Sequence, residues 1–309
     1  MERHRYLGGY DIASIVGVNP YASVEQVAMI KLGLLEPDKA TEAMSMGLLF
    51  EHAILFRAER DLGAIESRGK FLQHPEHPFL CGTIDGIAGS TLVDAKNLNH
   101  FSMNKWDENG PAEVYLVQLN YYAALLNAIG EPVHDAKLAV VFGGQTFRIY
   151  DVPLDKELGD ILISKGVEFW QRFIIGKEPL DLAAAPCSLL EKYYSKSNGT
   201  EITLEDDHIG YALREYLTLK SAIRDYETEL DADKAIIQAA MASASRGIWT
   251  DGDKAITVSW GDVSKTSFDS KRFQAEQPEL YKQYLKQSSY RVLRVTEKEL
   301  VKKLAAQAA

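Results

Sequence analysis

The chain has 309 residues, of which 46% are hydrophobic and 25% are charged, with a formal net charge of −10. This length allows one large domain or one domain with an appendage, and the composition is that of a globular protein with a sizeable core. No apolar run approaches the roughly eighteen residues of a membrane span, and no apolar segment of a secretory signal follows the basic N-terminus. We therefore expect a cytoplasmic protein.

The two cysteines, Cys81 and Cys187, lie more than a hundred positions apart. They provide no disulfide framework and no zinc or iron–sulfur spacing.

The acidic net charge argues against nucleic acid as a partner, but the charge is unevenly distributed. Residues 201–247 hold five Lys or Arg against ten Asp or Glu, whereas residues 261–303 hold ten against six. A basic tail on an acidic body is compatible with a DNA contact. The pattern also fits an ordinary solvated surface.

The first hundred residues predict helices followed by a hairpin. Two helices are expected within 11–35, separated at Asn19-Pro20, with Ser23 as the N-cap of the second. A longer helix over 41–62 has an apolar stripe at three- and four-residue spacing, and Glu51 lies on that stripe. Residues 79–96 predict a β-hairpin.

The remainder predicts a mixture of helices and strands. We expect helices over 112–129 and 155–175, and two strands over 137–142 and 145–152 joined by Gly143-Gly144. A looser stretch places a domain boundary near residue 180. After it we expect a long charged helical region over 204–244, either a helical hairpin or a coiled-coil arm. A strand over 256–260, a helix within 267–285 and a final strand over 290–295 should follow.

The hairpin brings two aspartates together. Gly89-Ser90 is a good two-residue turn, and counting outward from it places Gly86 opposite Val93 and Asp85 opposite Asp94. Cβ atoms in such positions lie about 4.5–5.5 Å apart. Like charges there are destabilising unless a cation joins them, so a hard divalent ion is the simplest explanation.

Lys96 strengthens this interpretation. It lies two residues after Asp94, on the same strand face, where it can orient a water or stabilise negative charge. The pattern Asp-x-Lys also occurs at Asp135 and at Asp269. Asp135 lies before its strand, and Asp269 opens a helix, where a role as N-cap explains it. Glu51 is a candidate further ligand. The pattern predicts metal-assisted phosphodiester hydrolysis.

Four segments, "LGGYDIASIVGVNPYAS", "MGLLFEHAI", "TIDGI" with "LVDAK", and "VYLVQLNYYAAL", resemble the YqaJ-type viral recombinases in that order. These are grouped with lambda exonuclease among the PD-(D/E)xK nucleases. The resemblance covers residues 3–172, and the tail resembles the extension of longer phage members.

The resemblance implies an α/β (α+β) fold, with a restriction-endonuclease-like core in which helices flank a central mixed sheet, plus a helical C-terminal extension. Residues 1–180 would form the nuclease domain and residues 181–309 the extension. It implies Mg²⁺-dependent 5′→3′ digestion of linear double-stranded DNA, with Mn²⁺ as a substitute. It further implies a homotrimeric ring, a single-strand annealing protein as partner, and a phage or prophage origin in a bacterial host.

Site roles follow from the same resemblance. Asp85, Asp94 and the Ala95 carbonyl would be metal ligands, Lys96 the catalytic lysine, and Glu51 the acid near a second metal. Tyr115 and Gln118 would line the active site from one helical face, with Tyr122 close by. Core packing is the simpler alternative for the two tyrosines.

Two departures from the family pattern affect these roles. Asp94 stands where Glu is usual, and Tyr10 stands where the family often has a Ser that helps hold a 5′-phosphate. Arg3 or Arg5 remains as a candidate phosphate-binding cation.

Two other functions remain open. One is an endonuclease or Cas4-like repair nuclease of the same fold, although the two cysteines cannot ligate an iron–sulfur cluster as Cas4-like enzymes often do. The other is a catalytically inactive phage protein that binds DNA ends.

Overall fold

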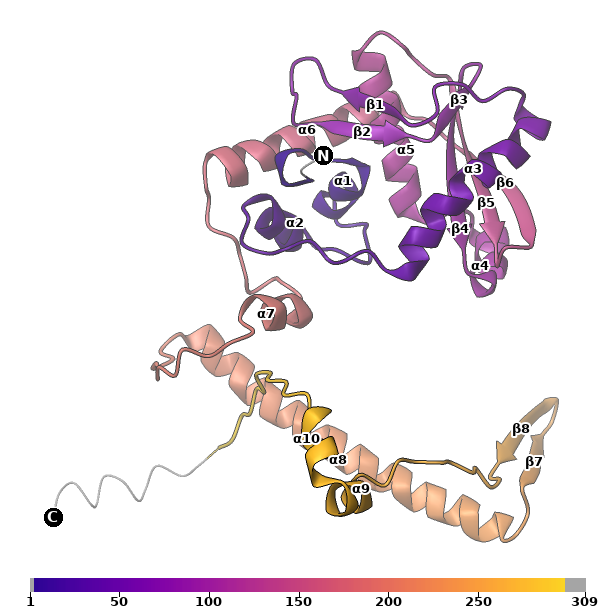
Figure 1. The fold of residues 1–309 in the computed structure, drawn as a ribbon. Coiled ribbons are helices and arrows are strands. Elements are labelled where there is room, and N and C mark those ends of the chain that lie inside the picture. The colour runs from indigo at the N-terminus through magenta and orange to yellow at the C-terminus, as the bar shows by residue number, and fades with distance from the viewer. Residues whose placement is uncertain (1–2, 298–309) are drawn as a thin grey trace, which may run out of the picture. The chain divides into compact units, whose positions relative to one another are not determined.

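The computed structural model describes residues 3–297, and the chain divides into two compact units, Met1–Tyr194 and Ser195–Ala309. The first unit contains a four-stranded mixed sheet flanked by helices, and the second is largely helical (Figure 1). The predicted fold class is therefore confirmed. No helix among residues 3–297 combines the length and the apolar character that a membrane span requires.

The sheet has the strand order β3-β4-β5-β6. Its strands are β3 (Gly86–Ala88), β4 (Thr91–Leu98), β5 (Asp135–Phe142) and β6 (Thr146–Val152). The β4–β5 pair is parallel and the other two pairs are antiparallel. A separate antiparallel pair joins β1 (Lys70–Gln73) to β2 (Cys81–Ile84). The sequence did not predict β1.

The expected hairpin register is confirmed for three pairs, whereas the expected pair of Asp85 with Asp94 lies beyond the ladder. Gly86 pairs with Val93, Ile87 with Leu92 and Ala88 with Thr91, and Gly89 adopts the positive φ of 60° that a tight hairpin turn requires. The hairpin is not continuous over residues 79–96, however. The chain bends at Asp85, where it leaves the β1–β2 pair and enters the four-stranded sheet.

Alternation along β4 divides its side chains between two helical layers. Leu92 belongs to the larger apolar cluster, which also contains residues of α5 (Glu113–Ala128) and α6 (Lys156–Phe169). Val93 packs instead with Leu55 of α3 (Glu42–Leu62), on the opposite face of the sheet. The sheet is therefore covered on both faces.

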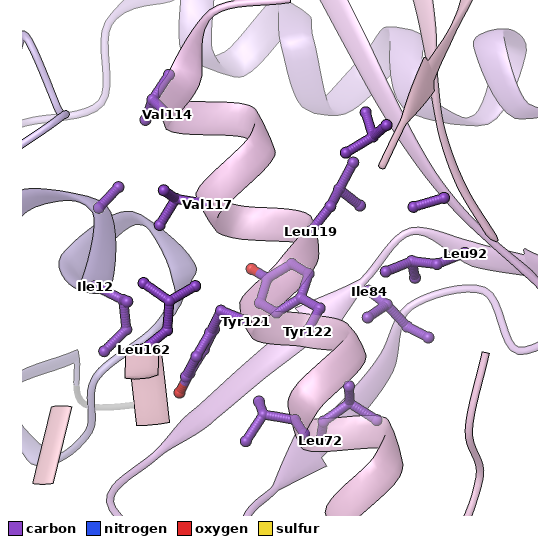
Figure 2. Packing of buried hydrophobic residues seen from close by; sticks show 14 of the residues in the cluster. Ile12, Leu72, Ile84, Leu92, Val114, Val117, Leu119, Tyr121, Tyr122 and Leu162 are labelled. Carbon is purple, nitrogen blue, oxygen red and sulfur yellow. The ribbon is translucent and has the colours of Figure 1, made fainter. Parts of the chain in front are cut away.

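Helix α5 is the central element of the first unit. It contacts α1 (Gly9–Ile15), α6, β1, β2 and β4. Figure 2 shows Leu119, Tyr121 and Tyr122 of α5 among the apolar side chains of this cluster. The buried Tyr121 hydroxyl donates to the carbonyls of Leu7 (3.0 Å) and Cys81 (3.2 Å), and so joins α5 to two other segments of the chain.

Shorter helices complete the first unit. Helix α2 (Val24–Lys31) begins after the predicted N-cap Ser23, whose hydroxyl accepts a hydrogen bond from the Gln26 N–H. A 3-10 turn spans Arg3–Arg5 and another spans His100–Ser102, followed by α4 (Met103–Asn109). Helix α6 continues into one π-helical turn over Trp170–Ile175.

The two units separate after Tyr194, fourteen positions beyond the boundary expected near residue 180. The difference arises from α7 (Cys187–Tyr193), which the sequence did not predict. Leu189 of α7 and Ala185 pack against the buried Met29 of α2, so residues 181–194 complete the first unit. A boundary judged from loose composition misses this packing.

The second unit begins its regular structure with α8 (Asp207–Met241), which corresponds to the expected long helix. A hairpin of β7 (Arg246–Asp251) and β8 (Lys254–Ser259) follows, and then α9 (Ser270–Glu276) and α10 (Pro278–Gln283). Asp269 is the N-cap of α9, as predicted. The predicted strand over 290–295 is wrong, because these residues have no regular structure and no partner strand.

Candidate active site

Asp85 is held against the strand that carries Asp94. One Asp85 carboxylate oxygen, Oδ2, accepts a hydrogen bond of 2.7 Å from the backbone N–H of Ala95. The backbone ladder between β3 and β4 ends at the pair Gly86–Val93. The Asp85 carboxylate therefore supplies the acceptor for Ala95 that a continuing strand would otherwise provide.

Asp94 is buried, with 2% of its surface exposed. Its Oδ2 lies 2.5 Å from the Lys96 ammonium, and apart from this ion pair no hydrogen bond reaches that oxygen within the described part of the chain. A buried carboxylate oxygen is costly unless a cation or a donor compensates it. Lys96 is the described partner that compensates this one.

The two aspartates disturb each other electrostatically. Burial, followed by the negative charge of Asp94, raises the pKa of Asp85 from 3.8 to about 7. Burial lowers the pKa of Lys96, but the charges of Asp94 and Asp85 outweigh it and hold the pKa above its ordinary value. Lys96 is therefore a stable cation, while the two carboxylates together carry more negative charge than one lysine neutralises.

Helix α5 contributes three polar side chains at this point. The Gln118 amide Nε2 lies 3.4 Å from Asp94 Oδ1 and 3.3 Å from the Tyr122 hydroxyl, and it donates to both. The Lys96 ammonium lies over the Tyr115 ring, 5.5 Å from its centroid. Burial raises the pKa of Tyr122 to about 12, which keeps this phenol protonated.

Two glycines allow α5 to approach this closely. A Cβ at Gly82 would lie 2.4 Å from Cε1 of Tyr122, and a Cβ at Gly9 would lie 2.9 Å from Cγ of Gln118. Sequence reasoning missed both. The available signal was a glycine inside the strand pattern "CGTI", which often marks a close backbone approach.

Glu51 stands apart from the two aspartates. It is half-buried on α3, one turn before the buried Leu55, and its charge makes only a small contribution to the raised pKa of Asp85. Among residues 3–297, no three His, Cys, Asp or Glu side chains come close enough to form a metal-binding group. The structure therefore brings Asp85, Asp94 and Lys96 together but does not gather Glu51 with them.

The candidate phosphate-binding residues lie in the N-terminal segment. Tyr10 is on α1 with 48% of its surface exposed, and burial of the remainder raises its pKa. Arg5 is exposed in the first 3-10 turn. The Arg3 side chain lies outside the described part of the chain. Phosphate binding by these three residues stays a prediction.

The donor set fits a divalent cation. Mg²⁺ prefers oxygen ligands and is commonly held by one or two carboxylates, with waters and substrate phosphate completing its shell. Asp85 and Asp94 provide two mutually repelling carboxylates, and among the described residues the buried Asp94 Oδ2 is paired with the Lys96 ammonium alone. Two carboxylates beside a lysine are the residue types that metal-assisted hydrolysis uses.

Comparison with known proteins adds an independent observation. Residues 1–128 match the model of the YqaJ-like viral recombinase domain. The resemblance expected from the sequence is thereby confirmed. The matched range, residues 1–128, ends with α5 and contains the clustered residues Asp85, Asp94, Lys96, Tyr115, Gln118 and Tyr122.

A curated relative extends the similarity over most of the chain. The protein YqaJ of Bacillus subtilis strain 168 is 24% identical over 297 residues, which cover 94% of this chain and 91% of YqaJ.

Two solved structures are similar to 56% of the chain. An alkaline exonuclease, LHK-Exo, from Laribacter hongkongensis has a TM-score of 0.47 at 15% identity, and 90% of it is covered. A phage-related exonuclease from Haemophilus somnus 129PT has a TM-score of 0.41 at 13% identity, and 96% of it is covered.

Proposed function

We propose that the protein is a metal-dependent deoxyribonuclease that digests linear double-stranded DNA as a 5′→3′ exonuclease. The observation that carries this proposal is the cluster of Asp85, Asp94 and Lys96, in which a single lysine faces two buried or half-buried carboxylates that repel each other. The match of residues 1–128 to the YqaJ-like viral recombinase domain supports it.

Asp85 and Asp94 would hold the metal, Mg²⁺ or in its place Mn²⁺, with the Ala95 carbonyl as a further ligand and Glu51 near a second ion. When bound, such an ion supplies Lewis-acid polarisation of a phosphoryl oxygen and a lower pKa for a bound water. The hydrogen bond from Ala95 holds Asp85 in place for this role. The Gln118 amide does the same for Asp94.

Lys96 would act directly on the reacting phosphate. Its pKa lies above the ordinary value, so it stays charged and can orient a water or stabilise the negative charge that develops on a phosphoryl oxygen. The Asp94 carboxylate and the Tyr115 ring fix the position of the ammonium. The protonated Tyr122 hydroxyl accepts from Gln118 and keeps that amide directed toward Asp94.

Further parts of the proposal rest on similarity to viral recombinases. The product would be a single-stranded tail for recombination, and a single-strand annealing protein would be the partner. We expect the nuclease unit to assemble as a homotrimer, in a phage or prophage setting within a bacterial cytoplasm. Arg3, Arg5 and Tyr10 would contact the phosphate at the DNA end.

The test compares linear and circular plasmid DNA in Mg²⁺, in Mn²⁺ and in EDTA. We expect release of mononucleotides from linear duplex in either metal, none in EDTA, and an intact covalently closed circle. A 5′-terminal phosphorothioate block should slow digestion more than a 3′ block. Nicking of the circle at a comparable rate would instead indicate an endonuclease.

The Asp94→Asn variant tests the site itself. The change keeps the shape of the side chain but removes the charge that would bind the metal, so digestion should fall by about a hundredfold or more. Binding of Mn²⁺ measured by calorimetry should weaken in parallel. A variant that digests DNA at the parental rate would show that the cluster is not the active site.

A further inference from the structure

Helix α8 has an apolar face that the other described residues of the second unit leave largely exposed. It spans 35 residues, yet Met241 at its C-terminal end is its only buried residue. Most helices in proteins owe their stability to the packing of an apolar face against other elements. A helix of this length with so little burial therefore points to a partner for that face.

Seven large apolar residues of α8 follow a coiled-coil pattern, whereas Tyr211, Leu213, Leu217 and Ile236 lie outside it. Positions alternate at three- and four-residue spacing along a seam that consists of Ile209, Ala212, Tyr216, Leu219, Ile223, Tyr226, Leu230, Asp233 and Ile237. These are the a and d positions of about four heptads. The large apolar side chains of this seam are between 37% and 69% exposed. The seam is thus continuous and exposed to solvent, and Asp233 is its one polar residue.

The charges that flank the seam favour a parallel pair. In a parallel coiled coil, each g residue contacts the e residue five positions later on the partner helix. Glu215 and Glu229 occupy g positions, and Lys220 and Lys234 occupy the e positions five residues beyond them. Both contacts therefore join opposite charges.

An antiparallel pair of α8 helices would have less favourable charge contacts at its g positions. There, g residues face g residues, and the two charged g residues of α8 are both glutamates. The Lys220 ammonium already lies over the ring of Tyr216, 5.9 Å from its centroid, so its stem borders the seam as e-position lysines do.

We propose that α8 forms a parallel, in-register coiled coil with α8 of a second copy of this chain. Asp233 then faces Asp233 of the second copy. A polar residue at one core position of a coiled coil costs stability and fixes the register. This inference does not depend on the nuclease proposal, because it rests on the second unit alone. It concerns a pairwise contact between α8 helices that is additional to any trimer of the first unit.

Disulfide cross-linking tests the contact directly. The full chain would carry Cys187→Ser, which removes the exposed native cysteine, together with Leu219→Cys in the seam. Oxidised glutathione should link two copies, because in-register d residues lie opposite each other. The matched control is Tyr211→Cys, which is 61% exposed but lies off the seam. Equal linking of both variants, or none at Leu219→Cys, would overturn the proposal.

Charge reversal tests orientation and partner together. Sedimentation velocity over a concentration series should show that Glu215→Lys and Lys220→Glu each weaken self-association of the full chain by about fivefold. The double variant restores opposite charges and should return to the parental value. A double variant as weak as either single variant would exclude the g–e contact.

Asp233→Leu gives a test in the opposite direction. Removing a like-charge pair from the seam should strengthen self-association by about tenfold or more in the same assay. No change would mean that Asp233 is not enclosed between two helices, and the coiled coil would be rejected. Circular dichroism on each variant separates these outcomes from a loss of helix.

Discussion

The Asp85 carboxylate accepts a hydrogen bond from the backbone N–H of Ala95, the residue directly after Asp94. One aspartate is thereby fixed to the strand that carries the other. The bend at Asp85 makes this contact possible, because it turns the chain from one sheet into the next. The close approach of the two carboxylates is therefore built into the backbone.

Lys96→Met should abolish most activity and destabilise the metal-free protein. Methionine keeps the length of the side chain but leaves the Asp94 carboxylate buried without a counter-charge, at a cost of roughly 3 kcal/mol in unfolding free energy. Combining Lys96→Met with Asp94→Asn should restore part of the lost unfolding free energy, as measured by urea unfolding. Lys137→Met is the matched control, because Lys137 pairs with the exposed Asp151 and should cost under about 1 kcal/mol.

Gly82→Ala should displace Tyr122 and reduce activity. The added Cβ would lie 2.4 Å from the tyrosine ring, so strain of about 1–3 kcal/mol is expected along with a lower rate of DNA digestion. Gly47→Ala in α3 is the control, since no atom lies within 4 Å of its Cβ and helix propensity favours alanine. Equal thermal melting of the two variants would contradict the steric argument.

Tyr121→Phe should lower stability more than it lowers activity. It removes the hydroxyl that the carbonyls of Leu7 and Cys81 share as a donor, at a cost of about 1 kcal/mol in urea unfolding, because the Leu7 carbonyl still accepts from the Cys81 N–H. Tyr122→Phe should lower activity more than stability, because it removes only the hydroxyl that accepts from Gln118 beside Asp94. If both variants lose stability and digestion rate alike, the two hydroxyls do not have separate roles.

In EDTA, the contribution of Asp85 to stability should decline as pH rises. Burial and Asp94 raise its pKa to about 7, whereas a free aspartate titrates near 3.9. Between these two values the folded protein holds a proton that the unfolded chain has released, so the free energy of unfolding falls with increasing pH. Urea unfolding at several pH values between 4 and 8 measures this. Asp85→Asn should reduce the slope, and an unchanged slope would contradict the assignment.

A chain ended at Tyr194 should be more stable than one ended at Leu180. The longer form keeps Ala185 and Leu189 against Met29, and the shorter one exposes that cluster. Burial of one leucine side chain contributes roughly 2 kcal/mol, so a difference of at least that size is expected in thermal or urea unfolding. Identical unfolding midpoints would place the true boundary of the first unit near residue 180.

Local patterns in the sequence were sufficient for a large part of this protein. Alternation along 91–98 and the Gly89-Ser90 turn predict the hairpin register, and with it the shared face of Asp94 and Lys96. Helical spacing predicts that Tyr115 and Gln118 lie on one face of α5, where they contact Lys96 and Asp94 respectively. These predictions succeed because side-chain direction over a few residues follows from backbone geometry alone.

Other features depended on packing between distant segments. The approach of Tyr122 to Gly82, the separation of Glu51 from the aspartates and the boundary after Tyr194 follow from how α5, α3 and α7 pack on the rest of the first unit. The expected strand over 290–295 failed for the same reason, since a strand needs a neighbouring strand that no local pattern can supply. Local sequence patterns establish which chemical groups lie along each element. Which of these groups meet depends on tertiary packing, because the distance between side chains of different elements follows from how whole elements pack.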